Sequence, residues 1–181
     1  AVLGAADHLL VVAARPAWRE ALKRIARTLE QAGLAYTLVG SASLAMNGVP
    51  LAVRDLDIQV TREGAYRFQE LFAGETVIDP VELKESPAVR SYLGHFEIDG
   101  QLVEVIGQME RLDGSAWRTA EAHTSRTVDL EGVPVQVAWL EEEALAYIHR
   151  RRPERAALCL PYCDPERLAA LLQRVAGVAD N

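Results

Sequence analysis

The sequence contains few of the residues that hold small stapled or metal-bound domains together. Its 181 residues include two cysteines, Cys159 and Cys163, and four histidines that are scattered without the spacing of metal ligands. Two cysteines alone cannot form a disulfide framework or a four-ligand zinc site. We interpret them as free thiols in a reducing compartment, which predicts a cytoplasmic protein.

Positive charge is also scarce. The chain has 19 Lys and Arg residues against 26 Asp and Glu residues, which gives a net charge of −7. A protein that binds an extended duplex needs a large face that neutralises phosphates. The charge balance therefore argues against an extended duplex DNA surface, although a small basic pocket for one nucleotide remains compatible with it.

The sequence has no apolar run long enough to span a membrane. Residues 1–14 are apolar but are interrupted by Asp7 and His8, and they lack the basic segment of a signal peptide. We therefore expect no membrane association. Half of all residues are apolar and a quarter are charged, which is an ordinary globular composition. The length is that of one domain.

Periodicity predicts an α+β fold. Apolar residues at three- and four-residue spacing predict helices at residues 18–32, 42–46, 64–72, 141–152 and 165–175, with a short helix beginning at residue 153. Strand patterns occur at residues 35–39, 56–60, 92–98, 101–106, 127–130 and 133–138. Asp99-Gly100 and Glu131-Gly132 each separate two of these strands, and such dipeptides are typical of tight hairpins.

One segment carries a pattern with a chemical meaning. Gly40-Ser41 lies between an expected strand and a short helix, and Asp55 and Asp57 follow thirteen residues later. Residues two apart in a strand point to the same face, with their Cα atoms roughly 6.5–7 Å apart. The two aspartates can therefore share divalent cations. A glycine lets the backbone approach a ligand closely, and Ser41 begins a helix whose free N–H groups attract phosphate.

A third carboxylate is expected from a neighbouring strand. Glu104 is the one acid in the middle of an otherwise apolar strand, where a carboxylate is costly to bury without a partner. Glu97 and Asp99, in the same hairpin, remain alternatives. The pattern predicts a site for Mg²⁺ or Mn²⁺ and a nucleoside triphosphate.

These motifs resemble the signature of the nucleotidyltransferase superfamily related to DNA polymerase beta. That signature is a hydrophobic residue and Gly-Ser, then nine to thirteen residues, then Asp-hydrophobic-Asp-hydrophobic. The chain looks most similar to small bacterial members, those of the abortive-infection type and the antibiotic nucleotidyltransferases. The resemblance implies a mixed β-sheet flanked by helices in residues 1–150. Residues 151–181 would form a C-terminal helical extension of the same domain.

The resemblance also implies roles for the site residues. Asp55, Asp57 and Glu104 would hold the metal, with Glu104 as a possible base, and Gly40 and Ser41 would hold the triphosphate. The expected reaction moves a nucleoside monophosphate to a hydroxyl of an unidentified acceptor, which could be a small molecule, a protein or an RNA end.

Other phosphate contacts are less well defined. Arg54 is a further candidate, although an arginine at such a position is more often solvated. The Arg150–Arg152 run is more often a helix terminus than a phosphate or acceptor contact.

Two positions depart from the pattern of the small members. Arg and Thr often precede the first aspartate in the order Arg-x-Thr-x-Asp-x-Asp, and this chain has Leu51 and Val53 there. The departure leaves open a second hypothesis, a degenerate, non-catalytic nucleotide-binding module that acts in a toxin–antitoxin-like pair. A glycosyltransferase that uses Asp-x-Asp is disfavoured by the small size and the early position of the motif.

Overall fold

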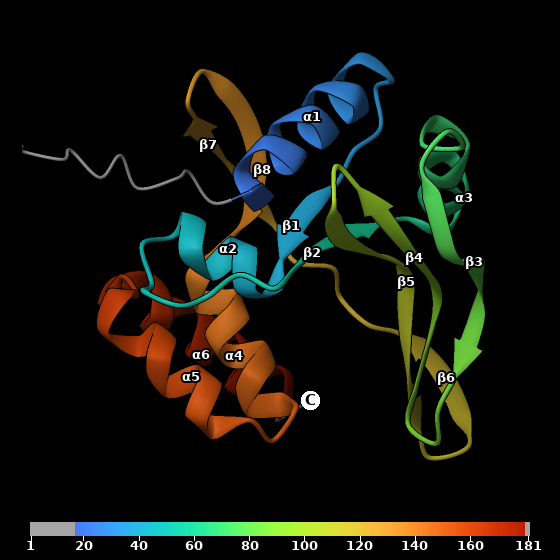
Figure 1. Cartoon of the computed structure of the whole chain (residues 1–181). Helices are drawn as coiled ribbons and strands as arrows, with labels where there is room; N and C mark the ends of the chain where they lie inside the picture. The colour runs from blue at the N-terminus through green and yellow to red at the C-terminus, as the bar shows by residue number, and fades with distance from the viewer. Residues whose placement is uncertain (1–16, 180–181) are drawn as a thin grey trace, which may run out of the picture.

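A mixed eight-stranded β-sheet forms the centre of the computed structural model, which describes residues 17–179 (Figure 1). Seven strands follow one another in the order β3-β4-β5-β2-β1-β8-β7, and β6 pairs with β5. Their bounds are β1 Thr37–Val39, β2 Asp55–Val60, β3 Thr76–Glu85, β4 Val89–Ile98, β5 Gln101–Asp113, β6 Ala116–Thr119, β7 Ser125–Leu130 and β8 Val133–Ala138. The β2–β5 and β1–β8 pairs are parallel, and the other pairs are antiparallel. The sheet and its flanking helices confirm the expected α+β class.

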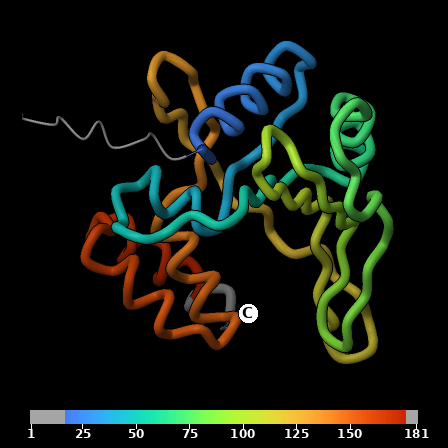
Figure 2. The backbone as a smooth tube through the Cα atoms, viewed as in Figure 1, coloured from blue at the N-terminus to red at the C-terminus, as the bar shows by residue number. Residues whose placement is uncertain are grey.

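The helices lie on both sides of this sheet, as the backbone trace shows (Figure 2). They are α1 Ala17–Gln31, α2 Gly40–Met46, α3 Arg62–Leu71, α4 Leu140–His149, α5 Pro153–Cys159 and α6 Pro165–Ala179, with a 3₁₀ turn at Leu160–Tyr162. Asp164 caps α6, because its Oδ1 accepts the N–H groups of Glu166 and Arg167. None of the helices in this described part is long and apolar enough to cross a bilayer. The apolar stretch 1–14 lies outside the described residues.

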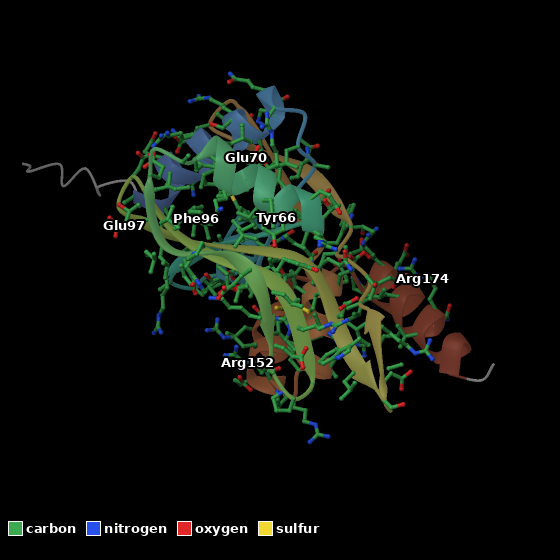
Figure 3. All side chains as sticks on the ribbon, turned by 90° about the vertical axis from the view of Figure 1, so that its right-hand side faces the viewer. Tyr66, Glu70, Phe96, Glu97, Arg152 and Arg174 are labelled. Carbon is green, nitrogen blue, oxygen red and sulfur yellow. The ribbon has the colours of Figure 1, made fainter. Side chains whose placement is uncertain are left out.

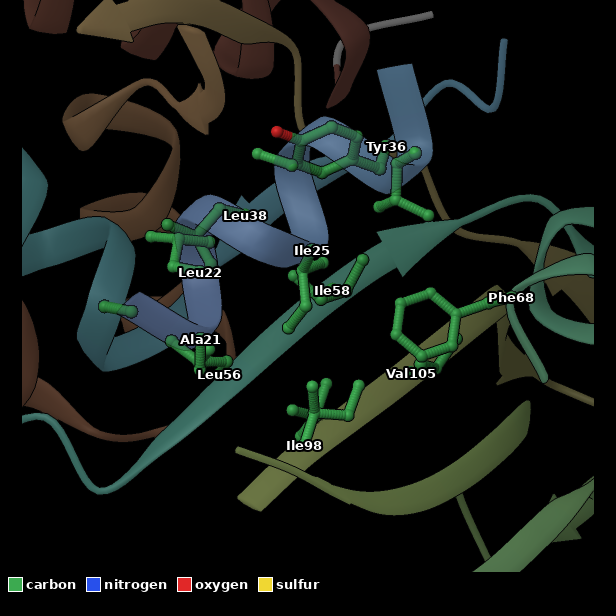
Figure 4. Packing of buried hydrophobic residues seen from close by; sticks show 14 of the residues in the cluster. Ala21, Leu22, Ile25, Tyr36, Leu38, Leu56, Ile58, Phe68, Ile98 and Val105 are labelled. Atoms are coloured by element: carbon green, nitrogen blue, oxygen red, sulfur yellow. The ribbon is translucent and has the colours of Figure 1, made fainter. Parts of the chain in front are cut away.

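The main core lies between one face of the sheet and the helices α1 and α3 (Figure 4). Alternate residues of β2 and β5 point into it, and Leu56, Ile58, Val103 and Val105 are fully buried. Because strand side chains alternate, the residues between them face the opposite side. This alternation places the polar residues of β2 and β5 together on the other face.

A second apolar cluster attaches the C-terminal helices to α2. Leu44 and Val49 pack there with apolar side chains of α4 and α5, namely Leu140, Ala144, Tyr147, Ala156 and Cys159. Cys159 is buried, and both cysteines are free thiols, as expected. Because α5 shares this cluster with α2 and α4, its packing supports the view that residues 151–181 extend the same domain, which stays a prediction.

The sequence patterns missed the strands β3 and β6. β3 is an edge strand in which Val81 is the one buried residue, so it shows no alternation of apolar and polar residues. β4 and β5 also run further than expected, to residues 89 and 113. Both hairpin turns were predicted correctly, and Asp99 and Glu131 have the positive φ angles of 51° and 53° that such turns require.

Candidate active site

The strand β2 places the two aspartates on one face of the sheet. Asp55 and Asp57 are half-buried and alternate with the fully buried Leu56 and Ile58. β1 lies beside β2 and delivers Gly40-Ser41 to the same place, because Val39 pairs with Asp57. The Ser41 hydroxyl lies 3.5 Å from Asp55 Oδ1. The turn and the first aspartate are therefore in direct contact.

Gly40 is in close contact with Asp57. A Cβ atom on Gly40 would overlap Asp57 Oδ2, and the residue has a φ of 70°, which disfavours side chains. The Gly40 N–H donates to Glu143 Oε1 at 2.7 Å. Because the Gly40 amide already donates to Glu143, we infer that the role of Gly40 in the site is steric: the absence of a side chain leaves room for Asp57.

Glu104 stands beside Asp57 on the parallel strand β5. The two residues are paired in register, so their side chains lie on the same face of neighbouring strands about 4.8 Å apart. On its other side Glu104 pairs with His95 of β4, and His95 Nε2 lies 2.8 Å from Glu104 Oε2. His95 Nδ1 is 3.5 Å from Asp79 of β3. A row of polar side chains thus crosses four strands.

The other candidates lie further from this row. Glu97 is exposed, and Figure 3 shows it at the rim of the molecule. Arg54 is also exposed, and its carbonyl accepts from the side chain of Gln101. Arg152 is exposed and pairs with Glu154. Of the arginine run, Arg150 alone lines a pocket next to Glu104.

The site concentrates negative charge at Asp57. Burial, together with the nearby carboxylates of Asp55, Glu104 and Glu143, raises the pKa of Asp57 to about 8 against the opposing charge of Arg150. Within residues 17–179, no three Asp, Glu, His or Cys side chains lie close enough to form a ready-made metal site. The oxygen donors on this face still fit a divalent cation, because carboxylates are the ligands that Mg²⁺ and Mn²⁺ prefer.

Glu143 is a functional candidate that the sequence patterns did not reveal. It is 3 % exposed and joins α4 to the Gly-Ser turn. Burial raises its pKa to about 7, although the Gly40 N–H and the charge of Arg150 favour the ionised form. It lies in a row of three glutamates in the first turn of α4, a pattern that is typical of a favourable contact with the helix dipole, so the sequence alone offers no signal for this bond.

These pKa values predict how stability depends on pH. Asp57 binds a proton near pH 8 in the folded chain but near its ordinary value of 3.8 when unfolded. The folded state therefore holds more protons between these values, and the metal-free free energy of unfolding should fall as pH rises from about 4 to about 8. Mn²⁺ should raise the melting temperature more at pH 8 than at pH 6, because it competes with that proton. Thermal scans with and without Mn²⁺ measure both effects. If Mn²⁺ raises the melting temperature equally at pH 6 and pH 8, Asp57 is not the group for which the metal and the proton compete.

Leu51 and Val53 fill space in the fold. Leu51 packs against the second apolar cluster and Val53 against the main core. Their side chains therefore have a packing role where small relatives often carry Arg and Thr. Arg150, whose charge acts on Asp57, is the positive group that the structure brings to this face instead.

Solved nucleotidyltransferase structures share this fold. TM1012 from Thermotoga maritima, a candidate nucleotidyltransferase, is 30% identical over 88% of this chain and 95% of its own, with a TM-score of 0.71. ANT(2'')-Ia in complex with adenylyl-2''-tobramycin is 12% identical over 91% and 99% of the two chains, with a TM-score of 0.58. The lincosamide antibiotic adenylyltransferase LnuA is 11% identical over 77% and 94%, with a TM-score of 0.53. Fold and carboxylate pattern together define an enzyme of the nucleotidyltransferase superfamily.

The family can be stated more closely. Residues 21–156 match the aminoglycoside-2''-adenylyltransferase family, and the chain belongs to it. A comparison with curated proteins found no match.

Proposed function

We propose that the protein transfers a nucleoside monophosphate from a nucleoside triphosphate to the hydroxyl of a small acceptor. The observation that supports this most strongly is the register of Asp57 and Glu104 on adjacent parallel strands, beside the Gly40-Ser41 turn. ANT(2'')-Ia and LnuA, which share the fold, were solved with small antibiotics or their adenylyl products. A small-molecule acceptor is therefore favoured over a protein or an RNA end.

Asp55 and Asp57 would hold the divalent cation, Mg²⁺ or Mn²⁺, with Glu104 as the third carboxylate. When bound, the cation neutralises the negative charge of the phosphates. Ser41 would orient the triphosphate, and Gly40 leaves room for Asp57 beneath the turn. Arg54 and Arg150 would be the candidate cations for the phosphates, and Arg150 is favoured because its charge reaches Asp57.

Glu104 would accept the proton of the acceptor hydroxyl. The acceptor oxygen then attacks the α-phosphorus, a new P–O bond forms, and the bond to the bridging oxygen breaks. Pyrophosphate leaves with that electron pair. The proton is held on Glu104, whose carboxylate is fixed by the His95 ring N–H. Most of the rate gain comes from placement and electrostatics.

A matched pair of variants tests this assignment. Glu104→Gln should lower pyrophosphate release and labelled nucleotide transfer by about 10²-fold or more, because an amide cannot take the proton. Glu97→Gln, in the same hairpin but exposed at the rim, should leave both rates close to those of the native protein. The measurement uses each of the four triphosphates with Mg²⁺ or Mn²⁺. If Glu97→Gln is the inactive variant, the third carboxylate has been misassigned.

We expect His95 to act through Glu104 as a positioning residue. His95→Ala should lower kcat about 10- to 100-fold with little change in the KM for the triphosphate, because the carboxylate loses its hydrogen-bond donor. His95→Gln can still donate an N–H and should recover part of kcat. Steady-state kinetics of both variants give this split, and a purely structural role predicts no recovery by glutamine.

A further inference from the structure

A pocket of about 540 Å³ adjoins Glu104 on the side away from the Gly-Ser turn. The sheet order places β1 and β2 on one side of β5 and β4 on the other. Leu93 of β4 and Ile106 of β5 form an apolar part of the pocket wall, and His149 and Arg150 reach it from α4 and its end. Because Ser41, which we assign to the triphosphate, lies on the β1–β2 side, this pocket is the place from which an acceptor would reach Glu104.

A β-bulge determines which side chains of β5 line this pocket. Tyr92 pairs with Gly107 and Arg90 with Glu110, so two residues of β5 stand opposite one residue of β4. Gln108, in the bulge, has a φ of 41°. A bulge of this kind shifts the alternation of side chains by one residue.

The shift changes the charge of the pocket wall. Before the bulge Glu104 and Ile106 face the pocket, whereas after it Met109 and Arg111 do, and Leu112 near the end of β5 also lines it. Glu110 is bonded to Arg90 and does not line the pocket. The bulge therefore presents an arginine where regular alternation would present an acid.

The resulting pocket has an excess of positive groups. Arg111 and Arg150 line it, and Glu104 is the one acid among its lining residues. Among residues 17–179, no ion pair joins Arg111 or Arg150 to a carboxylate. An acceptor with several ammonium groups would meet like charge here, but an anionic group would find Arg111, which forms no ion pair among the described residues.

We propose that the acceptor is a hydroxyl compound with an apolar body and an anionic group, and that Arg111 binds this group. The apolar body lies against Leu93, Ile106 and Met109, and the hydroxyl points to Glu104. This inference rests on the proposed nucleotidyl transfer, and it narrows the chemical class of the acceptor to anionic hydroxyl compounds. It separates this chain from relatives that act on cationic amino sugars such as tobramycin, which ANT(2'')-Ia holds in adenylylated form.

Three probes with the same aromatic body and benzylic hydroxyl test the charge preference. They are para-hydroxymethylbenzoate, para-hydroxymethylbenzamide and para-aminomethylbenzyl alcohol, and their binding is measured by ligand-observed NMR without nucleotide. The carboxylate should bind about 10- to 100-fold more tightly than the amine, as expected for one charge-assisted contact. Arg111→Met should remove this preference. Arg118→Met, at an exposed arginine paired with Asp113, is the control and should keep it.

A transfer assay with labelled ATP and the same probes separates the two proposals. Transfer to the carboxylate, with a higher acceptor KM but an unchanged ATP KM in Arg111→Met, supports both. Carboxylate-selective binding without transfer to any probe supports the pocket assignment and counts against nucleotidyl transfer. Equal or tighter binding of the amine, or no carboxylate binding at 10 mM, overturns the anionic acceptor. A change in the KM for ATP in Arg111→Met, with no change in the binding of the acceptor, also overturns the proposal.

Discussion

Asp57→Asn should abolish nucleotidyl transfer and at the same time make the metal-free protein more stable. Activity should fall about 10³-fold or more, because the variant loses a carboxylate that would hold the cation against the phosphates. Stability should rise, because asparagine is neutral in both states, whereas Asp57 must take up a proton when the chain folds and places it beside Asp55 and Glu104. The gain in melting temperature should grow as pH rises from about 4 to about 8, the range in which the unfolded chain is ionised at residue 57 and the folded chain is not.

Asp113→Asn is the matched control for this experiment. Asp113 is an exposed carboxylate paired with Arg118 at the end of β5. Its replacement should change neither the transfer rate nor the pH dependence of the melting temperature. A variant at residue 57 that keeps its activity, or that melts lower at pH 8 in the absence of metal, would contradict the proposed role of Asp57.

Gly40→Ala should have a comparably large effect on activity, for a reason that is purely steric. The new methyl group would overlap Asp57 Oδ2, so either the turn or the aspartate must move. We expect transfer to fall about 10³-fold, because a displacement of about 1 Å at such a site already costs about 10²-fold. The binding of Mn²⁺, measured by calorimetry, should weaken in parallel.

Gly33→Ala separates this overlap from backbone strain. Gly33 has a φ of 63°, close to the 70° of Gly40, but a Cβ there meets no atom within 4 Å. Its replacement should cost about 1 kcal/mol of stability and leave the kinetics unchanged. If both alanine variants lose activity equally, strain and not the contact with Asp57 explains the loss.

Much of the candidate site could be predicted from the sequence because its spacing follows from strand geometry. Residues two apart in β2 must share a face, and the pattern of apolar neighbours identifies which face is buried. The helix patterns and both hairpin turns were equally readable, because they depend on local residues. The edge strands β3 and β6 could not be predicted in this way, because most of their residues are exposed and their sequences therefore show no alternation of apolar and polar residues.

The contact between His95 and Glu104 could also have been predicted. Each is the fourth residue from the Asp99-Gly100 turn, and a two-residue turn fixes the pairing of its strands. The histidines showed no ligand spacing along the chain, which hid this relation across the hairpin. Glu143 differs, because its bond to Gly40 joins residues 103 positions apart and depends on how α4 packs on the sheet.

The bulge at Gln108 has a consequence for how such enzymes diverge. The register up to Gly107 is set by the turn, so loss of one residue at 108 would leave Glu104 and His95 in place. The loss would remove the bulge but would keep Met109 and Arg111 on the pocket wall and Glu110 on the opposite face, because the residues after position 108 keep their partners in β4. Loss of this one residue can thus straighten β5 without altering the charge of the pocket or the chemical step, and the length of the chain at this position is expected to vary among related chains independently of the charge of their acceptors.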